Sequence, residues 1–182
     1  MFRFENPVIA AVRSKEEFLS ALSSPVDVVF LLKSTINDLK EAIDAKNSSG
    51  KQLFLHADMC DGLGKDKAGM QYLAALGMDG IISTRTNVIA AAKAAGLITV
   101  QRFFIIDSAS VHTALESLIT ACPDCVEIMP GTLLPQIEFF RKNAKNMRLI
   151  AGGLIENKEQ MVAALSAGAD GVSVGKKELW FV

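Results

Sequence analysis

Short apolar runs alternate with amphipathic segments along the whole chain of 182 residues. Runs of about four to seven apolar residues are typical of buried parallel strands, because helices cover both faces of such a sheet. Eight runs predict strands: Val8–Val12, Val26–Leu32, Leu53–Asp58, Gly80–Ser83, Ile98–Phe103, Val126–Met129, Leu149–Ala151 and Gly171–Val174. The segments between them predict helices over Lys15–Leu22, Ile36–Lys46, Lys67–Leu76, Val88–Ala95, Ala109–Ala121, Leu134–Asn143 and Lys158–Ala167, with a short last helix over Lys176–Trp180.

The residues at the ends of these segments fit helix caps. Ser14, Thr35 and either Asp107 or Ser108 suit N-caps, and Gly77, Gly96 and Gly168 suit the position after a helix. Eight strands alternating with helices predict an α/β fold, a compact single-domain (β/α)₈ TIM barrel over residues 1–182. A doubly wound open sheet is the alternative, but it commonly has five or six strands, so eight favour a closed barrel.

The segments Gly77–Ser83 and Gly168–Val174 resemble each other and lie half a chain length apart. Each joins the end of a predicted helix to a predicted strand. Glycine and aspartate are common in any turn before a strand, so the similarity gives modest support to a repeated strand–helix unit.

Composition narrows the function classes. Half of the residues are apolar and the net charge is −1, which excludes a strongly basic nucleic-acid-binding protein but leaves room for a local basic patch. The chain has no apolar run of the roughly 20 residues that span a bilayer, and its start, Met1–Pro7, lacks the pattern of a secretory leader. We therefore expect a cytoplasmic protein without membrane contact. Three cysteines do not suggest a disulfide framework.

Glycines follow the last two predicted strands, where (β/α)₈ barrels often bind phosphate. Gly152, Gly153 and Gly175 let the backbone approach an anion, and the amides of Gly175 and Lys176 would open the short last helix, whose dipole favours an anion. The alternative is that these glycines only make tight turns. We expect a phosphate site formed by Gly152, Gly153, Ser173, Gly175 and Lys176.

Polar residues at the other strand ends are candidates for contacts with the rest of a ligand: Arg13, Lys33, His56, Asp58, Arg102 and Glu127. Alternation along a strand would put His56 and Asp58 on one face, where they could bind a metal, share a proton or bond hydroxyl groups. Buried Glu127 requires a partner, for which Lys33, Arg102 or a ligand hydroxyl are candidates. For each, a purely structural role is the alternative, and the sequence leaves open whether Gln101 or Arg102 points inward.

Other polar and cysteine residues give weaker indications of a functional site. Asp61–Asp66 predicts a flexible loop over the mouth, with Lys65 and Asp66 either offered to a ligand or merely solvated. Cys122 and Cys125 have redox spacing but precede a strand, so we interpret them as two buried cysteines without redox function. His112 lies in a predicted helix, where we expect it at the surface. The chain shows no nucleophile–base triad, P-loop or dinucleotide motif, and we expect no catalytic residue, no metal and no cofactor.

The chain resembles the glycerol-3-phosphate-responsive antiterminators over essentially its full length. The segments that carry this resemblance are Pro7–Arg13, Asp79–Arg85, Gln101–Ser108, Val126–Gly131 and Ile150–Leu154. The resemblance implies a (β/α)₈ barrel that senses glycerol 3-phosphate and, when bound, promotes transcription past a terminator in the leader mRNA of a glycerol uptake operon. Within it, the loops of Gly152–Gly153 and Gly175–Lys176 would hold the phosphate.

His56–Gly62 is also similar to the His-x-Asp-x-x-Asp-Gly stretch of ribulose-phosphate 3-epimerases, whose His and Asp bind a metal. Those enzymes need a further metal-binding His and an Asp beside the paired glycines. Here Ala151 precedes the glycines, and the other histidine, His112, lies in a helix. Because proton transfer requires the missing group within hydrogen-bond reach, a sensor is favoured over the alternative, a sugar-phosphate epimerase or isomerase.

The expected partners are glycerol 3-phosphate and leader mRNA, contacted directly or through another protein. Basic residues near the sixth helix, Arg141, Lys142, Lys145 and Arg148, are either an RNA contact or an ordinary solvated face, and the second is favoured. The apolar tail, Trp180–Val182, suggests packing across the base of the barrel or against another subunit. The oligomeric state stays open.

Overall fold

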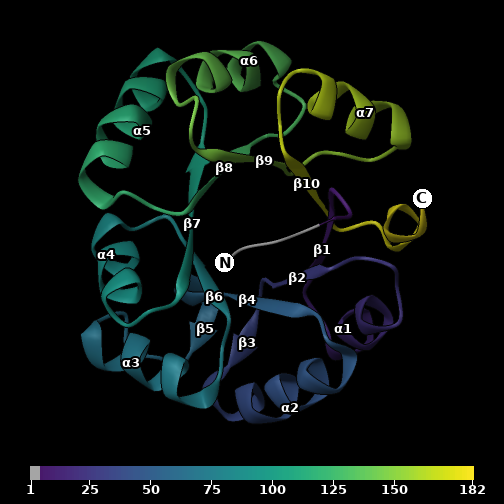
Figure 1. Ribbon diagram of the computed structural model, residues 1–182, viewed down its shortest axis with the longest axis vertical. Coiled ribbons are helices and arrows are strands. Elements are labelled where there is room, and N and C mark those ends of the chain that lie inside the picture. Colours follow the sequence, from purple (N-terminus) through teal and green to yellow (C-terminus); the bar gives the residue numbers. More distant parts are fainter. Residues whose placement is uncertain (1–4) are drawn as a thin grey trace.

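A closed barrel of parallel strands forms the centre of the computed structural model, which describes residues 5–182 (Figure 1). Around the barrel the strands follow the order β1-β10-β9-β8-β7-β6-β4-β2, with every neighbouring pair parallel. Their bounds are β1 Val8–Val12, β2 Val28–Leu31, β4 Gln52–His56, β6 Gly80–Ser83, β7 Ile98–Phe104, β8 Cys125–Met129, β9 Arg148–Gly152 and β10 Gly171–Val174. The predicted (β/α)₈ architecture is confirmed.

Helices surround the strands as an outer ring (Figure 1). Within the described residues these are α1 Lys15–Leu22, α2 Leu39–Ser49, α3 Lys67–Leu76, α4 Thr86–Ala94, α5 Ser108–Ala121, α6 Leu134–Asn143 and α7 Lys158–Ser166. The predicted helix Ile36–Lys46 begins as a separate 3₁₀ turn, η1 (Ile36–Asp38). In place of the predicted last helix there is a 3₁₀ turn of five residues, η3 (Lys177–Phe181).

The predicted caps are found where the sequence suggested them. Ser14 Oγ accepts a hydrogen bond from Glu17 N at 3.2 Å, and Asp107, rather than Ser108, caps α5 by accepting from Ser110 N at 2.8 Å. Thr35 caps η1. The three glycines after helices have φ angles of 90°, 84° and 110° at Gly77, Gly96 and Gly168, a region that favours glycine.

Alternation along the strands separates two apolar clusters. One fills the barrel and contains Ile9, Val28, Phe30, Phe54, Ile82, Val100, Cys125 and Ile150. The other lies between the strands and the helices, with members such as Val12, Leu55 and Ala151. Because side chains alternate along a strand, residues two positions beyond the inner cluster point into the barrel mouth.

An aspartate precedes every second strand of the barrel and ties it to the strand before. Asp79 Oδ2 accepts from Leu53 N at 2.8 Å, Asp124 Oδ2 from Thr99 N at 2.9 Å, and Asp170 Oδ2 from Leu149 N at 2.8 Å. Asp27 Oδ2 accepts from Asn6 N at 2.9 Å in the same way. The similarity between the segments around Asp79 and Asp170 therefore corresponds to a contact that recurs through the barrel.

The cationic partners of three of these aspartates come from the preceding outer helices. Lys46 Nζ lies 2.6 Å from Asp79 Oδ2, and Arg141 Nη2 lies 2.5 Å from Asp170 Oδ2. Lys93 Nζ is more distant, 3.9 Å from Asp124 Oδ1. These ion pairs attach α2, α4 and α6 to the barrel end at which the strands begin, and we call the four aspartates with their amide contacts the aspartate clips.

Two short elements at the mouth are absent from the sequence-based prediction. β3 (Ser34–Thr35) and β5 (Cys60–Asp61) pair in parallel outside the barrel and join the loops that follow β2 and β4. The predicted strand Leu53–Asp58 was too long, because β4 ends at His56 and the chain turns through η2 (Ala57–Met59). A strand of two residues has too few positions for an alternating pattern to reveal it.

The C-terminal turn packs on the side of the barrel, in the gap between α7 and α1 (Figure 1). Trp180 is fully buried, and its Nε1 donates to Val174 O at 2.8 Å. The expected packing across the base is therefore wrong, while Phe181 and Val182 remain half exposed. No helix within residues 5–182 is long and apolar enough to cross a membrane, and the start of the segment Met1–Pro7 lies outside the described residues.

Candidate functional site

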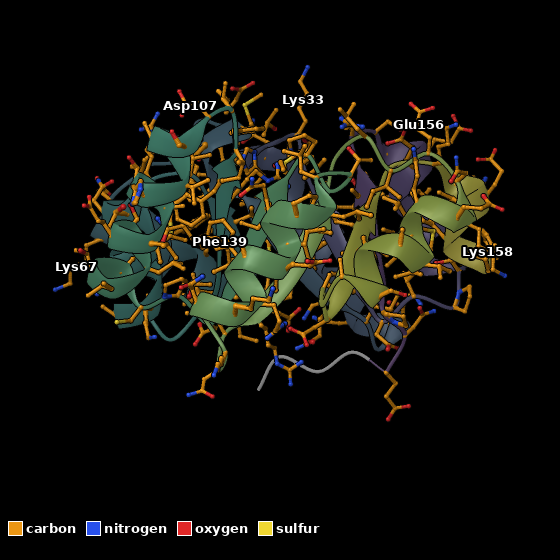
Figure 2. The ribbon with its side chains drawn as sticks, turned by 90° about the horizontal axis from the view of Figure 1, so that it is seen from above. Lys33, Lys67, Asp107, Phe139, Glu156 and Lys158 are labelled. Atoms are coloured by element: carbon orange, nitrogen blue, oxygen red, sulfur yellow. The ribbon has the colours of Figure 1, made fainter. Side chains whose placement is uncertain are left out.

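The loops that follow the strands gather at one end of the barrel, which we call the mouth. In Figure 2, Lys33, Asp107 and Glu156, which follow β2, β7 and β9, lie along the upper edge, while Lys67 and Lys158 lie to the two sides. Parallel strands place all their carboxyl ends at this edge, where (β/α)₈ barrels carry their sites.

A buried ion pair occupies the centre of the barrel just below the mouth. Arg102 Nε donates to Glu127 Oε2 at 2.6 Å, and Ser173 Oγ donates to Glu127 Oε1 at 2.6 Å. Glu127 is fully buried and Arg102 is 6% exposed. Arg102 therefore points inward, whereas Gln101 points toward α4 and donates from Nε2 to Thr86 Oγ1 at 3.3 Å. Of the partners expected for Glu127, Arg102 is the one found, and both carboxylate oxygens are occupied.

Gly152 leaves the space that this network needs. A Cβ at Gly152 would overlap Glu127 Oε1 and Ser173 Oγ. The residue is thus part of the packing around Glu127, and its side-chain position points into the barrel. Ala151, by contrast, is buried among the helices. A side chain at position 151 would face the helices and not the barrel interior, so Ala151 does not distinguish a sensor from an epimerase.

His56, at the end of β4, is buried with one ring nitrogen lacking a partner. The residue is 8% exposed, and among the described residues its Nε2 has no hydrogen bond. Asp58 Oδ2 is 3.9 Å from this atom. Burial, together with the nearby Arg102 cation, lowers the pKa of His56 to about 4, against the smaller opposing effects of Asp58, Glu127 and Leu32. The imidazole is therefore neutral at neutral pH.

Asp58 reaches His56 from the turn η2 and not from the strand, so the reason given for their proximity was wrong although the two side chains do meet. Burial alone would raise the pKa of Asp58, but hydrogen bonds from Thr84 N and Ser83 Oγ, both at 2.8 Å, and from Thr84 Oγ1 hold it below its usual value. Arg85 Nε lies 3.8 Å away. Ser83 and Thr84 did not enter the predicted site, although polar residues at the end of β6 were the available signal.

The two glycine-bearing loops after β9 and β10 lie side by side, because their strands are neighbours in the barrel. Gly153 has φ 74°, and Gly131 N donates to Gly152 O at 2.6 Å and to Gly153 O at 3.0 Å. These carbonyls are turned toward the loop after β8. Among residues 5–182, no acceptor is bonded to the amides of Leu154, Gly175 or Lys176.

Two cations border these loops. A Cβ at Gly175 would lie 3.2 Å from Arg13 Nη1, so the guanidinium stands against the β10 loop. Lys176 Nζ lies 3.5 Å from Glu156 Oε2, with half of the lysine side chain exposed. The expected contribution of a helix dipole is not available, because Lys176 precedes a 3₁₀ turn of five residues. We call the loop amides with Arg13 and Lys176 the anion cradle.

Other predicted residues lie apart from this group. Lys33 is exposed and points away from the molecule (Figure 2). Lys65 Nζ donates to Cys60 O at 2.6 Å and Asp66 caps α3, so both have structural roles. Arg141, the first of the basic residues near α6, is bonded to Gly168 O, Met147 O and Asp170.

The structure also places the two cysteines of redox spacing and the second histidine. Cys122 is exposed and Cys125 buried, both as free thiols, so the expectation of two buried cysteines was wrong for Cys122. Burial raises the pKa of the Cys125 thiol far above its usual value. His112 is exposed on α5, as predicted. Among residues 5–182, no three His, Cys, Asp or Glu side chains form a group that could hold a metal ion.

A cleft of about 390 Å³ between α1 and α2 opens beside the mouth, and the sequence did not indicate it. Its lining includes the apolar side chains of Phe18 and Leu31 and the cationic side chains of Arg13 and Lys33. Arg13 thus contributes to both this cleft and the anion cradle.

A family model and a curated relative both match almost the whole chain. The model of the family described as "Glycerol-3-phosphate responsive antiterminator" matches residues 8–180. The uncharacterized protein YgcP of Escherichia coli K12 is 32% identical over 177 residues, which cover 97% of this chain and 92% of that protein.

Solved structures give the same result. The glycerol uptake operon antiterminator regulatory protein of Listeria monocytogenes 4b F2365 superposes with a TM-score of 0.91 at 31% identity, over 97% of this chain and 95% of that one. An antiterminator-related protein of Thermotoga maritima MSB8 gives a TM-score of 0.86 at 31% identity, over 98% and 99% of the two chains. A putative deoxyribose-phosphate aldolase of Coccidioides immitis, at 11% identity and a TM-score of 0.76, shares the fold alone, over 97% and 83%. The chain belongs to the glycerol-3-phosphate responsive antiterminator family.

Proposed function

We propose that this protein senses glycerol 3-phosphate at the barrel mouth and, with the ligand bound, promotes transcription past a terminator in the leader mRNA of a glycerol uptake operon. Family membership supports the regulatory role, and the names of the Listeria and Thermotoga proteins refer to such an operon. In this proposal the protein acts inside the cell as a regulator without turnover.

The anion cradle is the observation that carries the proposal. It brings together unbonded backbone amides from two adjacent loops and the guanidinium of Arg13. Backbone amides and an arginine are the groups that recognise phosphate oxygens, and the charge-assisted bonds that they form are about twice as strong as neutral ones. We assign the phosphate end of the ligand to Gly153, Gly175, Arg13 and Lys176, with Gly152 and Ser173 supporting the loops from below.

The glycerol end of the ligand is assigned to the polar group at the centre of the mouth, His56, Asp58, Arg102 and Glu127. Of these, His56 has a buried ring nitrogen that no described residue satisfies, and Arg102 uses only Nε in a hydrogen bond with a described residue, whereas each oxygen of Glu127 accepts one hydrogen bond. Glu127 is fully buried and each of its oxygens accepts a hydrogen bond within the protein, so it is held in the packing of the barrel and is poorly placed to act as a general base. This supports a binding role over an enzymatic one.

Calorimetry with glycerol 3-phosphate tests the phosphate site. Lys176→Glu should weaken binding at least tenfold, since one favourable charge is replaced by a repulsive one, which corresponds to roughly 1.4 kcal/mol or more. Lys177→Glu, the exposed neighbour on η3, is the matched control and should bind like the wild type. Equal binding by all three proteins would rule out Lys176 as a ligand of the phosphate, and absent binding by the wild type would overturn the sensor itself.

The regulatory output needs a separate assay. A transcription reaction on a leader template with a terminator should yield more full-length RNA when protein and glycerol 3-phosphate are both present. A mobility shift with the leader RNA alone separates direct RNA contact from action through another protein. Conversion of the ligand to a product, followed by phosphorus NMR over hours, would favour the enzyme alternative.

A further inference from the structure

The cleft between α1 and α2 offers apolar surface that the proposed function does not use. Its volume is about 390 Å³, within the range of about 300–1,000 Å³ that is usual for small-molecule sites. The two helices follow consecutive strands, β1 and β2, and are neighbours in the outer ring (Figure 1). The apolar residues that line the cleft are Phe18, Leu19, Leu31, Ala42 and Ala45.

Part of this apolar lining is open to water. Leu19 is 51% exposed, whereas Phe18, Leu31 and Ala42 are buried. Moving one methylene group of a ligand from water into apolar surroundings favours binding roughly fourfold. An unbranched apolar chain in the cleft would therefore gain affinity with its length until the cleft is filled.

Arg13 connects the cleft to the anion cradle. Its side chain lines the cleft, and its Nη1 would lie 3.2 Å from a Cβ at Gly175 in the loop after β10. Among residues 5–182 the guanidinium has no ion pair and no hydrogen bond. An arginine without a partner is free to bind a phosphate group, for which its planar donors are well suited.

The other charged groups of the lining do not strengthen the attraction for an anion. Lys15 Nζ lies 2.7 Å from Glu41 Oε1, so this pair is neutral as a unit. The remaining charged residues of the lining are one cation, Lys33, and two acids, Asp38 and Asp61. Attraction for an anion is thus confined to the guanidinium at the cradle, and a neutral chain suits the rest of the cleft.

We propose that Arg13 and the cleft together bind a free phosphate monoester that carries an apolar chain, with the phosphate in the anion cradle and the chain between α1 and α2. An acyl ester of glycerol 3-phosphate has this chemistry. Because Arg13 serves both ligands, such a molecule competes with glycerol 3-phosphate. This inference rests on the proposed function, since it takes the anion cradle as the phosphate site.

Calorimetry with butyl, hexyl and octyl phosphate, each below the concentration at which it forms micelles, tests the inference. The affinity of the wild type should rise at least about tenfold from butyl to octyl phosphate. Octanol, which has the chain without the anion, should bind much more weakly than octyl phosphate. Glycerol 3-phosphate should displace octyl phosphate, and Arg13→Gln should weaken the binding of both.

Two pairs of variants separate the cleft from the cradle. Leu19→Ser should reduce the gain in affinity with chain length, whereas Val162→Ser, at a 52% exposed position of α7, should keep it. Ala45→Phe should abolish the gain by filling the cleft, whereas Ser48→Phe, at an exposed position of the same helix, should keep it. All four variants should bind glycerol 3-phosphate like the wild type, because none of these residues belongs to the anion cradle.

The outcomes distinguish this inference from the proposed function. Equal affinity of the wild type for butyl and octyl phosphate would overturn the inference and leave the sensor in place. Binding of octyl phosphate without any binding of glycerol 3-phosphate would overturn the proposed function but not the role of the cleft. Simultaneous binding of the two ligands would overturn the shared use of Arg13.

Two further results would place the chain elsewhere. An unchanged gain with chain length in Leu19→Ser and Ala45→Phe, with the circular dichroism spectrum of the wild type retained, would assign the chain to another surface. Sedimentation of the wild type with vesicles that contain phosphatidic acid would indicate a membrane surface instead of a free molecule. Either result would overturn the inference.

Discussion

Glu127 shows how a charged residue is accommodated inside a barrel. Its two oxygens receive hydrogen bonds from Arg102 and Ser173, and Gly152 leaves them room. A buried ion pair is tolerated only when its hydrogen bonds are complete, since the cost of removing two charges from water is large. The arrangement also fixes the position of the Arg102 guanidinium, on which the donors at the mouth depend.

Replacing Glu127 by glutamine should therefore destabilise the fold. Glu127→Gln keeps the shape but leaves Arg102 as an uncompensated buried cation, for which a loss of about 3 kcal/mol is expected. Urea unfolding followed by circular dichroism measures the change. Glu116→Gln, at an exposed position of α5, should leave the midpoint near that of the wild type. A midpoint for Glu127→Gln equal to that of the control would show that the pair contributes little.

His56 should make stability depend on pH. Its pKa is about 4 in the folded protein and near 6.5 in the unfolded chain, so the unfolded state binds more protons between these values. The contribution of His56 is complete above pH 6.5 and is lost as the pH falls toward 4, by about 3 kcal/mol. The difference in unfolding free energy between the wild type and His56→Gln, measured from pH 7.5 to pH 4.5, should follow this change. A constant difference over that range would contradict the lowered pKa.

At the residue scale the sequence indicated which polar residues follow the strands better than it indicated how their side chains contact one another. A carboxylate inside an apolar run had to be paired, and Arg102 was among its expected partners. The inward direction of Arg102 rather than Gln101 depends on strand register, which a run of apolar residues on both faces does not specify. The proximity of His56 and Asp58 depends on a 3₁₀ turn that alternation cannot indicate.

The aspartate clips act at the level of elements, because each holds two strands together at the end opposite the mouth. They differ in burial: Lys46, the partner of Asp79, has a side chain only 8% exposed, whereas that of Lys93, near Asp124, is 46% exposed. Removing the acid should therefore cost more at Asp79, where a buried cation remains.

We expect Asp79→Ala to lower the free energy of unfolding by about 3–5 kcal/mol, since it leaves Lys46 and Leu53 N without their acceptor. Asp124→Ala should cost about 1–3 kcal/mol, because Lys93 can be solvated and mainly the bonds to Thr99 are lost. Chemical denaturation of the two variants gives the comparison. Equal losses of unfolding free energy in the two variants would show that the burial of the lysine partner does not affect the cost of removing the aspartate.

Element boundaries followed the sequence closely where caps and apolar runs were clear. α1, α3 and α6 match the prediction residue for residue, as do β1, β6 and β10. β2 is shorter than expected, since apolar residues continue beyond the hydrogen-bonded ladder. The two-residue strands β3 and β5 form because two loops meet in space, and that meeting is a product of the barrel rather than of any local pattern.

For the whole molecule, closure of the barrel depends on the pairing of β1 with β10, and the C-terminal turn covers this seam. Trp180 lies against it, with its indole N–H bonded to Val174 O. As the only tryptophan of the chain, it should report on closure by fluorescence. The eight strands expected from the sequence were enough to predict a closed barrel. The sequence did not predict where on the barrel the last turn packs.

Trp180→Ala should destabilise the protein by about 3–5 kcal/mol, because it removes a large buried side chain and leaves Val174 O without its donor. Thermal unfolding compared with the wild type measures the loss. Phe181→Ala, next to it but half exposed, should cost much less. Similar losses of stability in both variants would show that Trp180 is not the main contact between the turn and the barrel.

The exposure of Arg13 and Lys176 has a consequence for how a sensor would respond. The cation at the centre of the barrel is already neutralised by Glu127, so attraction for an anionic ligand comes from side chains that water and salt can reach. Such attraction is screened and moderate. Exchange with the ligand should then be rapid, so that the occupancy of the site follows changes in the ligand concentration.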